Sequence, residues 1–211
     1  MENTTYIKIR YRGRLKSPSD VQPLIVETED ICKSNGWTYR IWDEDWKELQ
    51  TVHLNPAGQG MSFEGHAPLK GISFSIGESE GIWLTFTPDG MLQSLFTLVN
   101  PTFFLNDEQF PWQRVKTGYD GPKSHLAMCK LFRYLEDKYF EVFEVLDESG
   151  YWEERDDVKF TKWMNELIHD NKLLAEEMAA VDADDSLSKE QKYETTMRLI
   201  KEHGEKYRAK K

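Results

Sequence analysis

The chain has 211 residues, a length that suits one large domain or two small ones, and its 39% hydrophobic residues can form a buried core. Acidic residues outnumber basic ones by 37 to 27, and the formal net charge of -10 argues against non-specific binding of the whole molecule to nucleic acid or to anionic membranes. The sequence does not open with a secretory pattern, and no apolar run approaches the roughly 20 residues that span a bilayer, so we expect a cytoplasmic protein outside membranes.

The segment 6–46 predicts a strand, a helix and a second strand. Residues 6–12 alternate between apolar and basic side chains, the period of a strand with one buried face. A helix is expected to begin at Ser17-Pro18, which are typical start residues, and to end at Asn35-Gly36. The second strand follows at 37–42.

The middle of the chain predicts a loop and a hairpin. Residues 51–68 hold several glycines and prolines without a clear period, which is typical of a loop. Residues 69–76 and 82–86 both alternate and are separated by a glycine-containing stretch, so they predict a β-hairpin. Residues 91–104 are apolar, and their pattern fits a strand as well as a helix.

The opening pattern returns near residue 110, at a constant spacing of 104 positions. This spacing separates Arg10 from Arg114, Pro18 from Pro122, and Asp43 from Asp147. Two β-α-β segments of equal length suggest an internal duplication, although the alternative of chance similarity between two generic units stays open because few residues are identical.

These patterns predict an α+β fold in which a duplicated β-α-β unit and a central β-hairpin share one mostly antiparallel sheet, with the helices on one face. The element order is ferredoxin-like in general character, but that fold hosts too many functions to imply one. We expect a domain at 1–152, with halves at about 6–46 and 110–152 and the hairpin region at 69–104 between them. Residues 153–211 predict a C-terminal helical arm, and the molecule is expected to be a monomer or a dimer through this arm.

Alternation along the predicted strands places basic and aromatic side chains on the sheet face opposite the helices. Guanidinium groups can bind phosphate or carboxylate, and indole rings can stack on planar groups, so this face is a candidate binding site for an anionic ligand. The alternatives are a solvated face, pairing with Glu144 and other acids, or cover by the arm. The candidate ligand-binding residues are Arg10, Arg12, Arg40, Trp42, Trp83, Arg114 and Lys116.

The two strands that end the repeated units are each followed or closed by acidic residues. Equivalent positions in a duplicated fold could bring these carboxylates together around a divalent cation, whereas the alternative is that they solvate and cap turns. The candidate metal ligands are Asp43, Glu44, Asp147 and Glu148. The five histidines show no H-x-x-x-H or H-E-x-x-H spacing, so we expect no zinc site, and without a cofactor motif we expect no cofactor.

No catalytic nucleophile motif is present, and the sequence therefore favours a non-catalytic binding or interaction protein with a protein partner. One alternative is an enzyme that acts on a small phosphorylated or carboxylated substrate at the basic surface, with help from a metal. A further alternative is an acidic inhibitor or immunity protein for a basic toxin, for which net charge is the only support.

Overall fold

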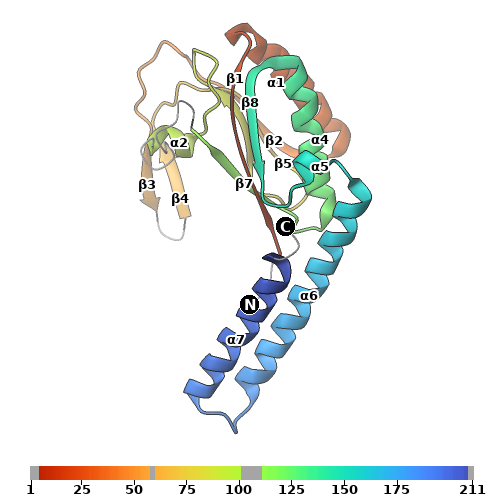
Figure 1. The fold of residues 1–211 in the computed structure, drawn as a ribbon. Coiled ribbons are helices and arrows are strands. Elements are labelled where there is room, and N and C mark those ends of the chain that lie inside the picture. Colours follow the sequence, from red (N-terminus) through yellow and green to blue (C-terminus); the bar gives the residue numbers. More distant parts are fainter. Residues whose placement is uncertain (1–4, 58–59, 101–110, 209–211) are drawn as a thin grey trace. The chain divides into compact units, whose positions relative to one another are not determined.

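The computed structural model describes residues 5–57, 60–100 and 111–208. The chain is mixed α+β, with about 48% helix and 25% strand in antiparallel sheets, which confirms the predicted fold class (Figure 1). Two compact units form, one at 6–157 and the other at 158–208 together with Thr5, and they are described separately below.

The strands are β1 (Ile7–Leu15), β2 (Thr38–Asp43), β3 (His53–Ala57), β4 (Gly60–Glu64), β5 (Lys70–Ser75), β6 (Ile82–Phe86), β7 (Gln113–Thr117) and β8 (Phe140–Asp147). The helices are the 3-10 turn η1 (Pro18–Asp20), α1 (Val21–Asn35), α2 (Leu95–Val99), α4 (Pro122–Tyr139), α5 (Tyr151–Glu154), α6 (Asp157–Ala183) and α7 (Lys189–Arg208).

The strands pair in three sheets, whereas the sequence predicts one. In the first sheet β1 lies between β7 and β8, and in the second β5 lies between β2 and β6, with all pairs antiparallel. The two are linked at isolated bridges, Arg14 to Met91 and Phe86 to Leu92. The Tyr11 hydroxyl adds a further link, because it donates to Trp83 O at 3.1 Å and accepts from Trp83 N at 2.8 Å.

The third sheet is the hairpin β3–β4, which corrects the loop predicted at 51–68. Pro56 lies within β3, where a two-stranded ribbon leaves free edges that tolerate a residue without an N–H group. The hairpin predicted at 69–86 is confirmed as β5–β6. The segment 91–104, whose pattern fits a strand or a helix, contains the short helix α2. The Ser94 hydroxyl caps this helix by accepting a hydrogen bond from Thr97 N. Residues 101–104 lie outside the described part of the chain.

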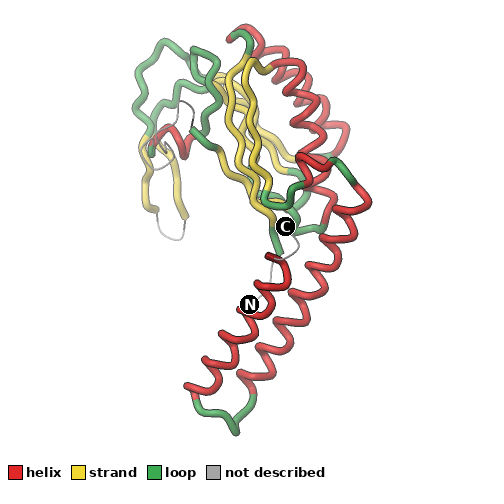
Figure 2. Tube along the Cα trace, in the orientation of Figure 1, coloured by secondary structure: helices red, strands yellow, loops and turns green. Residues whose placement is uncertain are grey.

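Helices α1 and α4 lie along the same side of the strands (Figure 2). Both bury an apolar face, which in α1 includes Leu24, Ile25 and Cys32. The Glu27 carboxylate of α1 joins the two helices, since it accepts hydrogen bonds from Lys138 Nζ at 2.6 Å and from the Tyr139 hydroxyl at 2.6 Å. The two helices cover this side of the strands, which carries the buried residues of β1.

The second unit is a hairpin of α6 and α7. A capping box starts α7, with Ser188 Oγ accepting from Gln191 N at 3.2 Å and Gln191 Oε1 accepting from Ser188 N at 2.9 Å. The helices are joined where His203 Nε2 lies 2.6 Å from Asn171 Oδ1. None of the helices in the described residues is both long and apolar enough to cross a membrane.

Candidate functional site

Strands β1 and β7 place basic side chains directly opposite one another. The antiparallel register pairs Lys8 with Lys116 and Arg10 with Arg114, and we call these four residues the basic face. Their buried neighbours Ile9 and Val115 are also paired and therefore point to the other side of the sheet. Arg10 and Arg114, which stand 104 positions apart in the sequence, are thus direct partners in the register of two adjacent strands.

The two arginines at the centre of the basic face have no carboxylate within ion-pair distance among the described residues. At its edge, Lys116 Nζ lies 3.5 Å from Glu80 Oε1, and this carboxylate raises the pKa of Lys116. Arg12, the next outward residue of β1, binds Glu144 at 2.6 Å, which is the pairing that the sequence suggested as an alternative to a ligand site. Within the basic face, Lys8, Arg10 and Arg114 therefore have no ion-pair partner among the described residues, whereas Lys116 has one.

Aromatic rings flank the basic face at both ends. The ring of Trp112 lies 5.8 Å from the guanidinium carbon of Arg10 and 4.3 Å from that of Arg12. The ring of Tyr6 lies 4.7 Å from Lys116 Nζ. These cation–π contacts hold the long side chains beside flat, apolar surfaces.

A cavity of about 410 Å³ opens beside Arg114. Its walls include three aromatic rings, of Trp83, Phe96 and Trp112, together with the side chains of Ser94 and Thr97. Clefts that bind small molecules have roughly this volume and combine apolar walls with a few polar groups. Glu80 and Arg114 line the same cavity, which therefore combines apolar rings with one acidic and one basic residue.

Two predicted site residues, Arg40 and Trp42, do not line the cavity, although the Trp42 ring packs against Trp83 with centroids 5.2 Å apart. Trp42 is only 7% exposed and packs in a hydrophobic cluster with Val52, Leu69 and Leu95, while its Nε1 donates to Ser73 Oγ at 2.9 Å. The guanidinium of Arg40 covers the Trp42 ring at 3.9 Å. Trp42 is thus a core residue, since later segments of the chain cover this face of β2, and it is unavailable for stacking on a ligand.

The four predicted metal ligands do not converge. Asp43 ends β2, where its side chain is 71% exposed and bound to Lys70, and Glu44 Oε2 lies 3.3 Å from His66 Nδ1. Asp147 ends β8 in a different sheet, and Glu148 follows it as an exposed residue. Equivalent positions in the sequence are therefore separated in space, because β2 pairs with β5 and β8 pairs with β1.

Asp147 instead belongs to a buried polar cluster that the sequence analysis missed. It is paired with Ile9 in the register of β1 and β8, so it points to the helix side of the sheet. There it meets His125 and Cys129 of α4, and one potential ligand atom from each of these three residues lies within 4.8 Å of the others. The signal in the sequence was the His-x-x-x-Cys spacing, which puts both side chains on one helix face.

Hydrogen bonds fix the cluster from all sides. Thr117 Oγ1 lies 2.8 Å from His125 Nδ1, while His125 Nε2 lies 3.2 Å from Asp147 Oδ2. The Asp147 carboxylate also accepts from Ser149 N at 2.8 Å and from Trp152 N at 3.0 Å. Helix α4, strand β7 and the turn after β8 thereby hold one another through polar groups.

Burial and hydrogen bonding act in opposite directions on the pKa values in this cluster. Burial opposes the charged form of Asp147, but hydrogen bonds from His125 and Ser149 prevail and hold the pKa of this carboxyl below its usual value. Burial, with a smaller contribution from the Asp147 charge, raises the pKa of the Cys129 thiol well above its usual value. The side chains of His125 and Asp147 are fully buried, so this arrangement has no direct access to a substrate in solution.

Comparisons of the chain with protein-family models, with curated proteins and with solved structures found no match.

Proposed function

We propose that the protein is a non-catalytic binding protein whose basic face holds a small anionic ligand, with the adjacent cavity accepting the ligand's planar or apolar part. The observation that carries this proposal is the direct opposition of Arg10 and Arg114 in a chain of net charge -10. In the enzyme alternative, a metal held by Asp147 would not reach a substrate at the basic face, because the two lie on opposite sides of the sheet.

Two like-charged pairs in succession are unfavourable for the sheet. Cross-strand pairs change stability by roughly 0.2–1 kcal/mol, and like charges that face each other directly are destabilising. Lys8 with Lys116 and Arg10 with Arg114 both have this arrangement. A bound anion would convert the repulsion into attraction, which gives a reason for the fold to keep it.

The chemistry of the walls favours a phosphorylated or carboxylated small molecule with a flat group. Arginine binds such anions through two parallel N–H donors, and Arg114 lines the cavity. Trp83 and Trp112 line the same cavity and offer apolar rings to a planar group. A cavity of about 410 Å³ suits a metabolite better than a polymer, which would need a continuous groove.

The test is isothermal titration calorimetry of the full chain with inorganic phosphate, citrate and adenosine monophosphate. Binding of at least one of these probes is expected, with the nucleotide binding more tightly than phosphate because it also fills the cavity. The Arg114→Gln variant should weaken that binding by about 10- to 150-fold, which corresponds to roughly 1.5–3 kcal/mol for a charged hydrogen bond.

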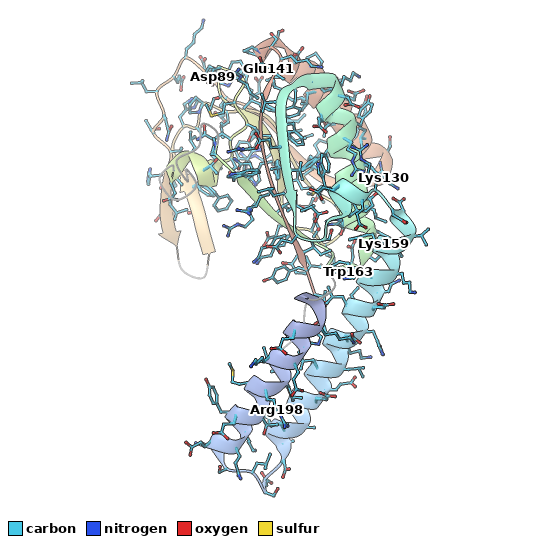
Figure 3. All side chains as sticks on the ribbon, in the orientation of Figure 1. Asp89, Lys130, Glu141, Lys159, Trp163 and Arg198 are labelled. Atoms are coloured by element: carbon cyan, nitrogen blue, oxygen red, sulfur yellow. The ribbon has the colours of Figure 1, made fainter. Side chains whose placement is uncertain are left out.

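Arg198→Gln is the matched control, since Arg198 is an exposed arginine of α7 (Figure 3). It should bind the probe as the unaltered chain does. Equal losses in Arg114→Gln and Arg198→Gln would show that only net charge matters, and the proposal would then be rejected, as it would by the absence of binding to all three anions.

We also infer that 6–46 and 110–152 are copies of one ancestral unit with a ferredoxin-like element order. Helices α1 and α4 end at Asn35 and Tyr139, 104 positions apart, and β2 and β8 end at Asp43 and Asp147 with the same spacing. A twofold axis that exchanged the halves would pass between Arg10 and Arg114. The hairpin β5–β6 pairs with β2 and breaks the symmetry, so the test is whether the two segments superpose at this spacing in an experimental structure.

A second candidate function is interaction with a protein through the helical arm. One stripe of α7 exposes apolar side chains at helical spacing, of which Tyr193 is 67% exposed and Met197 and Ile200 are 47% and 43% exposed. A dimer through this stripe would give a concentration-dependent mass in analytical ultracentrifugation. The Met197→Glu variant should then be monomeric, whereas a monomeric unaltered chain would reject self-association.

A further inference from the structure

We propose that His125, Cys129 and Asp147 bind one zinc ion beneath helix α4. The proposal does not depend on anion binding, because the basic face lies on the opposite side of the sheet. Among the described residues, this cluster is the one group of three or more His, Cys, Asp and Glu side chains whose ligand atoms lie within 4.8 Å of one another.

The distances between the three ligand atoms fit a tetrahedral site. Atoms bound to one tetrahedral zinc ion lie roughly 3.3–3.7 Å from each other, given the usual zinc–nitrogen, zinc–oxygen and zinc–sulfur bond lengths. His125 Nε2 lies 3.2 Å from Asp147 Oδ2 and 3.7 Å from Cys129 Sγ. The third edge, from Cys129 Sγ to Asp147, is at most 4.8 Å, so zinc binding would shorten it by up to about 1 Å.

A fourth oxygen faces the same space. The Ser149 hydroxyl lies 3.3 Å from His125 Nε2 and 2.8 Å from each Asp147 oxygen. Imidazole, thiolate and carboxylate are the protein ligands that zinc takes, and a water held by the Ser149 hydroxyl would complete the four positions.

The surrounding hydrogen bonds are those that orient zinc ligands. A histidine that binds zinc through one nitrogen donates the other N–H to a neighbouring acceptor. His125 turns Nε2 toward Cys129 and Asp147, and its Nδ1 lies 2.8 Å from Thr117 Oγ1, which can accept that bond. The backbone N–H groups of Ser149 and Trp152 fix the Asp147 carboxylate.

Full burial makes this a structural site. Closed sites of this kind stabilise the fold, whereas catalytic zinc keeps one position open to substrate. The ligands come from α4 and from the end of β8, with Thr117 in β7 behind them, so the ion would clamp the helix of the second half to its strands.

The test uses the full chain freed of metal with EDTA. Zinc is titrated against a chromophoric chelator, both by addition to the folded protein and by refolding with zinc present, because a buried site can load slowly. Cobalt serves as the spectroscopic probe, since a cobalt–thiolate bond adds charge-transfer absorption in the near ultraviolet. We expect one ion per chain and that absorption band.

Cys32→Ser is the matched control, because Cys32 is the other buried thiol and lies on α1 outside the cluster. The cobalt–thiolate band should persist in Cys32→Ser and vanish in Cys129→Ser. If Cys129→Ser does not fold, a band that persists in Cys32→Ser still identifies Cys129 as the ligand, because it is the other cysteine of the chain. Thr117→Val should weaken zinc binding by about 10- to 100-fold. Absence of one-to-one uptake by both loading routes, or loss of the band in Cys32→Ser, would overturn the proposal.

Discussion

Asp43 and Asp147 end strands β2 and β8, and their replacement by alanine should have very different effects on stability. The Asp147 carboxylate accepts hydrogen bonds from Ser149 N, Ser149 Oγ and Trp152 N and also contacts His125, with its side chain fully buried. Asp147→Ala leaves the Ser149 and Trp152 N–H groups and the Ser149 hydroxyl without this acceptor, and each buried donor that loses its acceptor costs about 1–3 kcal/mol. We therefore expect Asp147→Ala to lose about 3–5 kcal/mol of unfolding free energy.

Asp43→Ala should lose less than about 1 kcal/mol, because exposed ion pairs such as that with Lys70 contribute little. The assay is urea-induced unfolding followed by tryptophan fluorescence at pH 7, with EDTA present so that metal does not contribute. The dependence of free energy on urea should be the same in all three chains, so that midpoints report stability. If the two replacements cost the same, the buried hydrogen bonds of Asp147 do not stabilise the fold as argued.

Three further predictions concern stability. The pKa of Asp147 is lowered in the folded state, so the difference in unfolding free energy between the unaltered chain and Asp147→Ala should be complete above the unfolded-state pKa of about 3.9. This difference should shrink as the pH falls further. A difference that stays constant in acid, measured by urea unfolding, would contradict the prediction. Gly71→Ala should lower the unfolding free energy by at least about 1–3 kcal/mol in chemical denaturation, because a Cβ at φ +150 would lie 2.1 Å from Leu84 O. The control is Gly204→Ala in α7, where a Cβ meets no neighbour. This variant should raise helix stability by about 1 kcal/mol in circular dichroism melts. Trp42→Ala should lose about 3–5 kcal/mol in urea unfolding, and a loss below about 1 kcal/mol would show that its cluster is not a core.

The arrangement of β1 and β7 was predictable because two independent patterns agreed on it. Alternation assigned Arg10 and Arg114 to one face each, and the spacing of 104 made them equivalent. The register then places them opposite each other. A shift by one residue would have buried both charges, which explains why a simple pattern was sufficient here.

The burial of Trp42 was not predictable from the same kind of pattern. Alternation assigns a side chain to a face of its strand, but it does not say whether a later segment covers that face. The cover comes from Val52 and Leu69, which directly precede β3 and β5, and from Leu95 in the five-residue helix α2. Tertiary packing of such segments leaves no local signal in the sequence.

The cluster around His125 was missed for a different reason. Searches for metal motifs compare one segment at a time, whereas His125 and Cys129 meet Asp147 only after α4 packs on β8. The spacing of 104 contained a usable clue, because Val21 and Ile25, which stand 104 positions before His125 and Cys129, are both buried and apolar. Polar residues at buried positions whose counterparts at this spacing are apolar indicate a specific polar contact.

The central position of β1 has a consequence for synthesis on the ribosome. Its partners β7 and β8 follow roughly a hundred residues later, and at about 5–20 residues per second the emerging chain carries an unpaired β1 for several seconds or longer. An apolar strand with both edges free would be prone to pair with other nascent chains. Lys8, Arg10 and Arg12 discourage such pairing, so two of the charges that later form the basic face, Lys8 and Arg10, also keep the unpaired strand from associating with other chains.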